Sequence, residues 1–191
     1  MIELKDGRVL DDVDHVILAT GYITSYPFLA HLHSDNTCTT EAGEELLVTS
    51  DGEMTHNLHR DIFYIPDPTL AFVGVPYYVA TFSLFDFQAQ AVARVFAGKA
   101  RLPTKTDMRR EYEKRVEQTG LGRGFHSLHG RGLEIAYVQG LVDWMNSSLA
   151  GTGEPLMLGH SEEWKQGYNE LKAKTTASFR PSKEGGQLGA G

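Results

Sequence analysis

The sequence predicts an α/β protein whose sheet is incomplete and whose C-terminal part is helical. Two short apolar runs, Val16–Ala19 and Leu70–Val75, are typical of buried β-strands. Apolar residues then recur at helical spacing from about Thr81 to Ala97. After Pro103 the chain carries further helical patterns, the first of them strongly charged. Together these patterns favour a few strands and one long helix, followed by a helical extension.

The first 19 residues contain the clearest strand pattern. Ile2 alternates with charged neighbours, Asp6 and Gly7 form a hairpin turn pair, and apolar residues resume at Val9. The uninterrupted run Val16–Ala19 suits a strand covered on both faces, as in a parallel sheet. A lone hairpin is at best marginally stable in water, so this strand needs sheet neighbours. We expect those neighbours to lie outside this polypeptide.

The middle of the chain combines loops with a second strand and a helix. The segment 30–60 is polar and predicts loops with short strands. The Leu70–Val75 strand leads to Thr81 or Ser83, either of which can cap a helix that stops at Gly98. The apolar positions of this helix are Leu84, Phe87, Ala91, Val92 and Val95.

Three more helices are predicted beyond residue 103. Asp107–Gln118 is strongly charged and is interpreted as a solvated helix. Leu133–Leu149 is amphipathic, and Glu162–Lys174 is a third candidate. The apolar side of the amphipathic helix contains Ile135, Val138, Leu141, Val142 and Met145. The Gly-rich stretch 182–191 is predicted to be disordered.

Composition and charge exclude several classes of function. The formal net charge is −7, which disfavours electrostatic binding to nucleic acid or anionic lipid. Cys38 is the only cysteine, so neither an intrachain disulfide nor a cysteine-based zinc site can form. The sequence contains no apolar run of the ~20 residues that span a bilayer, and Met1–Lys5 does not resemble a signal peptide. We therefore expect an intracellular, cytoplasmic protein without membrane association.

The histidines do not indicate a metal site. Six of the eight form three close pairs: His31 and His33, His56 and His59, and His126 and His129. No acidic partner or third histidine stands at a spacing used by helical metal sites. Solvated or packed histidines explain the pattern, and no metal is predicted.

Two stretches resemble flavin-containing monooxygenases. The run Val16–Tyr22, followed by Pro27–Leu29, is similar to the family's return from the NADPH domain to the FAD domain. The second stretch runs from Asn57 to Pro103. It resembles the family's last sheet strand, the last helix of its FAD domain and the segment by which the chain leaves that domain. The resemblance implies the distal part of a two-dinucleotide-binding-domain flavoprotein, with core residues 1–103. Residues 104–180 would then be a helical extension and 181–191 a disordered tail.

The phosphate-binding turns of that family are not found in this sequence. The Gly-rich turns for FAD and NADPH precede the Val16–Tyr22 element in the family. The segment Gly120–Gly124 looks superficially similar, but it follows a charged helix and Phe125 stands where the third glycine belongs. A flexible interhelical loop is the better interpretation. We therefore expect a fragment, a truncated form or a degenerate copy, which by itself binds neither FAD nor NADP tightly.

The resemblance also implies where a flavin lies. The helix that opens at Thr81–Ser83 corresponds to the family helix that lies against the isoalloxazine ring, and its positive end suits the charge of reduced flavin. The implied cofactor-binding residues are Thr20, Gly21, Tyr78, Thr81, Phe82 and Ser83. The alternatives are that Thr81 and Ser83 are ordinary helix caps and that Gly21 is a simple strand-ending turn. No catalytic side chain is expected, because the cofactor supplies the reactive atom.

The implied function of the parent protein is FAD- and NADPH-dependent monooxygenation. Its substrates would be O₂ and small soft nucleophiles that are oxygenated at nitrogen or sulfur. A Baeyer–Villiger monooxygenase or another two-domain flavoprotein oxidoreductase is an alternative, and a non-catalytic remnant or docking module is a second one. Homo-oligomerisation stays open.

Overall fold

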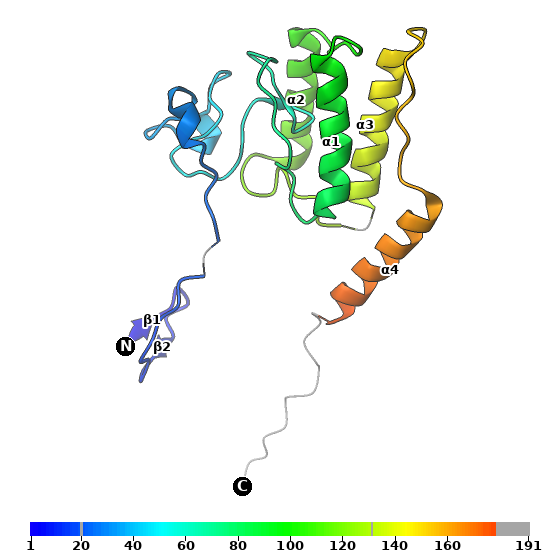
Figure 1. Cartoon of the computed structure of the whole chain (residues 1–191). Coiled ribbons are helices and arrows are strands. Elements are labelled where there is room, and N and C mark those ends of the chain that lie inside the picture. The colour runs from blue at the N-terminus through cyan, green and yellow to red at the C-terminus, as the bar shows by residue number, and fades with distance from the viewer. Residues whose placement is uncertain (20, 131, 179–191) are drawn as a thin grey trace.

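The computed structural model describes residues 1–19, 21–130 and 132–178 of the 191-residue chain. Its helices are α1 Thr81–Phe96, α2 Lys105–Thr119, α3 Leu133–Leu149 and α4 Glu162–Ser178. Two antiparallel strand pairs precede them: β1 Ile2–Glu3 with β2 Val9–Leu10, and β3 Leu58–His59 with β4 Phe63–Tyr64. Two 3₁₀ helices, Pro27–Leu32 and Thr39–Glu41, lie between the pairs. Figure 1 shows α1 and α3 side by side, with the β1–β2 hairpin and α4 projecting away from them.

The N-terminal hairpin confirms the predicted turn. Ile2 pairs with Leu10 and Glu3 with Val9. Gly7 turns the chain with a φ of +81°, a left-handed conformation that glycine adopts without steric cost. The turn residues predicted from the sequence therefore lie where the hairpin reverses.

The run Val16–Ala19 is not the buried strand that its sequence predicts. Residues 11–19 have no strand pairing, and Val16, Ile17 and Leu18 are 64%, 88% and 84% exposed. A strand buried on both faces needs a neighbour on each side, and no described segment of this chain provides one. The run instead lies in an extended arm between the hairpin and the helical body (Figure 1).

We expect the exposed arm to cause self-association of the purified chain. An unpaired backbone carrying contiguous apolar side chains is a template for pairing with another copy. Ile17→Lys places a charge in the middle of that surface, so it should shift the protein towards monomer in light scattering at matched concentrations. Leu158→Lys is the control, because Leu158 is 82% exposed but lies outside the arm. Equal effects of the two substitutions would show that the arm has no special role.

The predicted strand Leu70–Val75 is reduced to a single bridge. Ala71 bridges Phe63, and the backbone N–H of Phe72 donates to the carbonyl of Ile62 at 2.8 Å. Gly74, with a φ of +94°, then turns the chain where the Phe85 ring packs against it. The prediction of a full strand is therefore wrong, although the segment does extend the β3–β4 hairpin.

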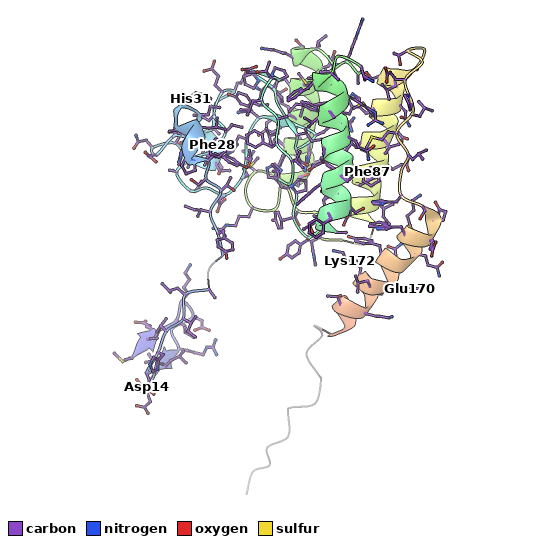
Figure 2. The ribbon with its side chains drawn as sticks, in the orientation of Figure 1. Asp14, Phe28, His31, Phe87, Glu170 and Lys172 are labelled. Carbon is purple, nitrogen blue, oxygen red and sulfur yellow. The ribbon has the colours of Figure 1, made fainter. Side chains whose placement is uncertain are left out.

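The core lies where α1 and α3 pack on the β3–β4 hairpin. Its most buried residues include Ile62, Phe63, Leu84, Phe87, Ala91, Val138, Leu141, Val142 and Met145. Figure 2 shows Phe87 on the side of α1 that faces α3. The predicted helical periodicity of both helices is confirmed, because their buried positions recur every three or four residues.

The other two helices also form where the sequence predicts them. Thr104 caps α2, accepting a hydrogen bond from the N–H of Asp107 at 3.1 Å, so the helix starts two residues before the predicted position. The hydroxyl of Ser161 accepts a hydrogen bond from the N–H of Trp164 at the start of α4. In the described part of the chain, no helix has both the length and the apolar character needed to cross a membrane. The predicted disorder of 182–191 concerns residues outside the described ones.

Candidate functional site at the start of helix α1

The start of α1 is capped by a residue distant in sequence. Ala80 is the N-cap residue and has no side-chain cap of its own. Its backbone N–H donates to both carboxylate oxygens of Glu134, at 3.1 and 3.0 Å. The prediction that Thr81 or Ser83 caps this helix is therefore wrong. Both residues stand inside the helix, where they are free for another role.

The first turn of α1 presents polar and aromatic groups to the surface. Thr81 is exposed, Phe82 is 91% exposed and Ser83 is partly buried. Helix geometry leaves the N–H groups of these three residues without intrahelical acceptors, and it gives this end of the helix a partial positive charge that the Glu134 carboxylate partly offsets. An almost fully exposed phenylalanine beside a positive helix end offers both a flat apolar contact and hydrogen-bond donors.

Tyr78 has a strained backbone directly before this helix. Its φ is +62°, which non-glycine residues rarely adopt. Its ring is 58% exposed and lies 5.1 Å from the Tyr77 ring and 4.8 Å from the His129 ring, centroid to centroid. Such strain persists only where surrounding contacts enforce it, and it is concentrated at ligand and active sites.

The predicted Gly21 turn is connected to the same region. Gly21 is exposed, with a φ of +85°, and a side chain built there would lie 3.8 Å from an Arg123 guanidinium nitrogen. The hydroxyl of Tyr77 donates to the carbonyl of Arg123. Arg123 therefore stands between Gly21 and the aromatic pair before α1. Thr20, the remaining predicted site residue, lies outside the described residues.

The segment around His126 holds Tyr77 in place. The N–H of Tyr77 donates to the carbonyl of His126 at 3.2 Å, and the N–H of Leu128 donates to the carbonyl of Tyr77 at 3.1 Å. His126 itself is buried, with Nδ1 2.7 Å from Asp61 Oδ1 and Nε2 2.9 Å from the carbonyl of Thr55. The geometry before α1 thus depends on this histidine.

Asp61, Arg115 and His126 form a buried charged group, the Asp61 cluster. Asp61 is fully buried, and Arg115 contacts it at 2.7 Å while donating to the carbonyl of Phe125 at 2.7 Å. Burial alone raises the pKa of the Asp61 carboxyl, but the hydrogen bond and charge of His126, with those of Arg115, outweigh burial and lower this pKa. The interpretation of α2 as a solvated charged face therefore needs correction, because Arg115 points inward.

Sequence reasoning missed the Asp61 cluster and Glu134. The Asp61 cluster has no local pattern, since its three members lie on three separate segments. Glu134 does leave a signal: with Val138, Leu141 and Met145 it recurs at helical spacing, so it is an acidic residue on the buried face of α3. A charge at such a position indicates a specific partner.

The start of α1 is an exposed surface rather than a closed pocket. A groove of about 570 Å³ lies elsewhere, between α2 and the turn after β4, with Glu44, Lys105 and Arg109 among its lining residues. Its walls mix charges of both signs and do not include the predicted site residues. Within the described ranges, no group of three or more His, Cys, Asp or Glu side chains is arranged to hold a metal ion.

Comparisons with known proteins agree on one family. Residues 2–150 match the family model described as flavin-binding monooxygenase-like. The flavin-containing monooxygenase ustF2 of Aspergillus flavus is 46% identical over 176 residues, covering 92% of this chain and 35% of that protein. The thiol-specific monooxygenase of Saccharomyces cerevisiae is 36% identical over 109 residues, covering 56% of this chain and 24% of that protein. This chain thus spans about a third of the length of ustF2.

A solved structure shares the fold. The S-allyl-L-cysteine S-oxygenase of Allium sativum matches with a TM-score of 0.56 over 85% of this chain and 32% of its own, at 24% identity. At that level of identity the likeness concerns the fold alone. The helices and short strands described above therefore correspond to part of a larger α/β architecture.

Proposed function

Because this chain belongs to the flavin-binding monooxygenase-like family, we propose that it forms the C-terminal part of the flavin site of an FAD- and NADPH-dependent monooxygenase. The proposed reaction transfers one oxygen atom from O₂ to nitrogen or sulfur of a small soft nucleophile, and two electrons from NADPH reduce the other oxygen atom to water. The name of one similar protein, a thiol-specific monooxygenase, supports sulfur as an acceptor. The observation that carries the proposal is the exposed, aromatic start of α1.

The residues at this helix start fit the chemistry of a flavin. The isoalloxazine ring is flat and largely apolar, and in its reduced form it carries negative charge near N1 and the C2 carbonyl. Phe82 and Tyr78 offer exposed aromatic surface, and the N–H groups of Thr81–Ser83 offer donors at a positive helix end. The helix start and the ring are therefore complementary in polarity and charge.

Each residue has a distinct role under this proposal. The first-turn N–H groups of Thr81–Ser83 stabilise negative charge on the ring, and Phe82 and Tyr78 pack on it and exclude water. Gly21 lets the backbone approach the cofactor closely, and Thr20 lies beside it in sequence. Bound FAD, reduced by NADPH, supplies the reactivity towards O₂. The protein therefore supplies position, electrostatics and a dry environment rather than a nucleophile.

A chimera tests this function. The segment of ustF2 that matches this chain is replaced by residues 1–191, and flavin absorbance and NADPH-dependent oxygenation of a thiol are measured. We expect a yellow, active protein, whereas the 191-residue chain by itself should retain little FAD. In the chimera, Phe82→Asp should abolish flavin retention, because it replaces an apolar contact with the flat ring by a charged carboxylate.

The matched control is Leu158→Asp, which introduces the same charge at an exposed apolar residue outside the first turn of α1. It should leave flavin content unchanged. A folded chimera without flavin, or full flavin retention by Phe82→Asp, would contradict the proposal.

A further inference from the structure

Glu134 is a buried carboxylate between two helix starts. It lies in the first turn of α3 and is fully buried. Figure 1 shows that α1 and α3 begin at the same end of the helical body. The carboxylate therefore lies near two positive helix ends. Both of its oxygens also accept a hydrogen bond from the N–H of Ala80. These interactions offset the free-energy cost of burying the negative charge.

Helix α4 places two side chains, Tyr168 and Lys172, beside this segment. The hydroxyl of Tyr168 is buried and makes no hydrogen bond within the described residues, and its pKa is raised by burial and by the nearby carboxylate of Glu134. Lys172 donates to the carbonyl of Tyr78 at 2.9 Å, and its ammonium lies 5.3 Å from the centre of the Tyr168 ring. Figure 2 shows Lys172 on the side of α4 nearer the start of α1, and Glu170 on the other side.

A stack of rings fixes α4 in the position from which these contacts are made. His160 and Trp164 lie parallel with ring centroids 3.5 Å apart, and Trp164 and Tyr168 follow at 4.9 Å. His160 in turn contacts the edge of Phe87, a core residue of α1, at 4.6 Å. The stack thus runs from the core to Lys172, one helical turn beyond Tyr168.

We propose that Glu134, Tyr168 and Lys172 form a clamp that holds the Tyr78–Ala80 segment, which makes α4 a positioning element of the site at the start of α1. The backbone of His126–Leu128 holds the neighbouring Tyr77, and the clamp holds Tyr78 and Ala80. Together they keep Tyr78 at its positive φ with its ring exposed. Only the identity of the ligand that this segment faces rests on the proposed function.

Amide hydrogen exchange of the full 191-residue chain tests the clamp. Glu134→Gln removes the charge and keeps one acceptor, and Glu134→Leu removes both. We expect exchange of the amides of Ala80 and Leu84, the hydrogen-bonded amides at this helix start, to accelerate about tenfold in Glu134→Gln and further in Glu134→Leu, with mid-helix amides of α1 unchanged. Lys172→Met keeps the aliphatic stem beside Tyr168 and should accelerate the same amides about threefold.

Two matched controls remove a charge elsewhere. Glu163→Gln and Lys114→Met alter exposed residues of α4 and α2, and they should leave exchange of the Ala80 and Leu84 amides unchanged. The double variant Glu134→Gln with Lys172→Met should accelerate exchange by a factor that differs from the product of the single effects, because both residues act on one segment.

Unchanged exchange of the Ala80 and Leu84 amides in folded Glu134→Gln would overturn the clamp. If Glu134→Gln unfolds as a whole, Lys172→Met becomes the deciding variant, because Lys172 is partly exposed and its replacement should leave the protein folded. Exchange that is unchanged in Lys172→Met, or accelerated uniformly along the chain, would refute the proposal. No flavin takes part in this measurement. If the chimera fails to bind flavin but hydrogen exchange changes as expected in the Glu134 and Lys172 variants, only the proposed function would be overturned.

Discussion

Asp61→Ala is expected to lower the free energy of unfolding by about 3–5 kcal/mol, because it breaks a buried ion pair. The substitution leaves His126, which is 4% exposed, and the inward-pointing Arg115 without their shared carboxylate. It also puts alanine at a φ of +58°, where a side chain without local hydrogen bonds is strained. Such a loss is a large fraction of the stability of an ordinary domain.

Two further substitutions separate the causes of this loss. Asp61→Asn keeps an acceptor and tolerates the left-handed backbone, so it should cost clearly less than alanine. Asp35→Ala is the control, since its side chain is 93% exposed and it should change stability little. Chemical denaturation at pH 7 measures all three. If Asp61→Ala and Asp35→Ala have equal stability, the Asp61 cluster does not stabilise the fold.

Acidification from pH 7.5 to pH 5 is expected to lower the free energy of unfolding by about 4 kcal/mol through two buried histidines. Burial lowers the pKa of His56 to about 4, with the charge of His126 adding to this effect and Asp51 opposing it. Burial also lowers the pKa of His59 to about 3, helped by the neighbouring Arg60. Both rings are therefore neutral in the folded protein at pH 5.

The direction of this effect follows from proton uptake. In the unfolded chain both histidines take up a proton below about pH 6.5. In the folded chain they take one up only near pH 4 and pH 3. Their contribution to stability is therefore fully present above pH 6.5 and is lost as the pH falls towards 4 and 3.

Denaturant unfolding at pH 5, 6 and 7.5 measures the slope. His59→Phe replaces a buried ring that contacts Trp144 with an apolar ring, so it should remove about half of the pH dependence. His15→Phe, at an exposed position, should leave the slope unchanged. A wild-type protein equally stable at pH 5 and pH 7.5 would contradict the assignment of both histidines.

Local sequence predicts the helices and the first hairpin well. The Leu133–Leu149 helix forms with the predicted boundaries, and α1 and α2 differ from prediction by one or two residues at their ends. These elements depend on apolar spacing, caps and turn residues that are close together in the chain. Family membership was also readable, because the residues around Val16–Tyr22 and 57–103 retain their order and spacing.

The failed predictions involve partners distant in sequence. Thr81 and Ser83 do not cap α1, because Glu134 supplies the acceptor from 54 residues away. The strand predicted at Val16–Ala19 finds no partner within the described residues, so its apolar side chains stay exposed. A strand requires both a suitable sequence and a neighbour, and only the first is visible in the residues themselves.

The sequence by itself therefore determined the helices, the first turn and the family to which the chain belongs. The tertiary structure decided which charges are buried together and how the start of α1 is held. Asp61, Arg115 and His126 come from three separate segments, and Glu134 meets Ala80 across the core. Periodicity records which face of one element is buried, but contains no information on which residue of another element will meet it.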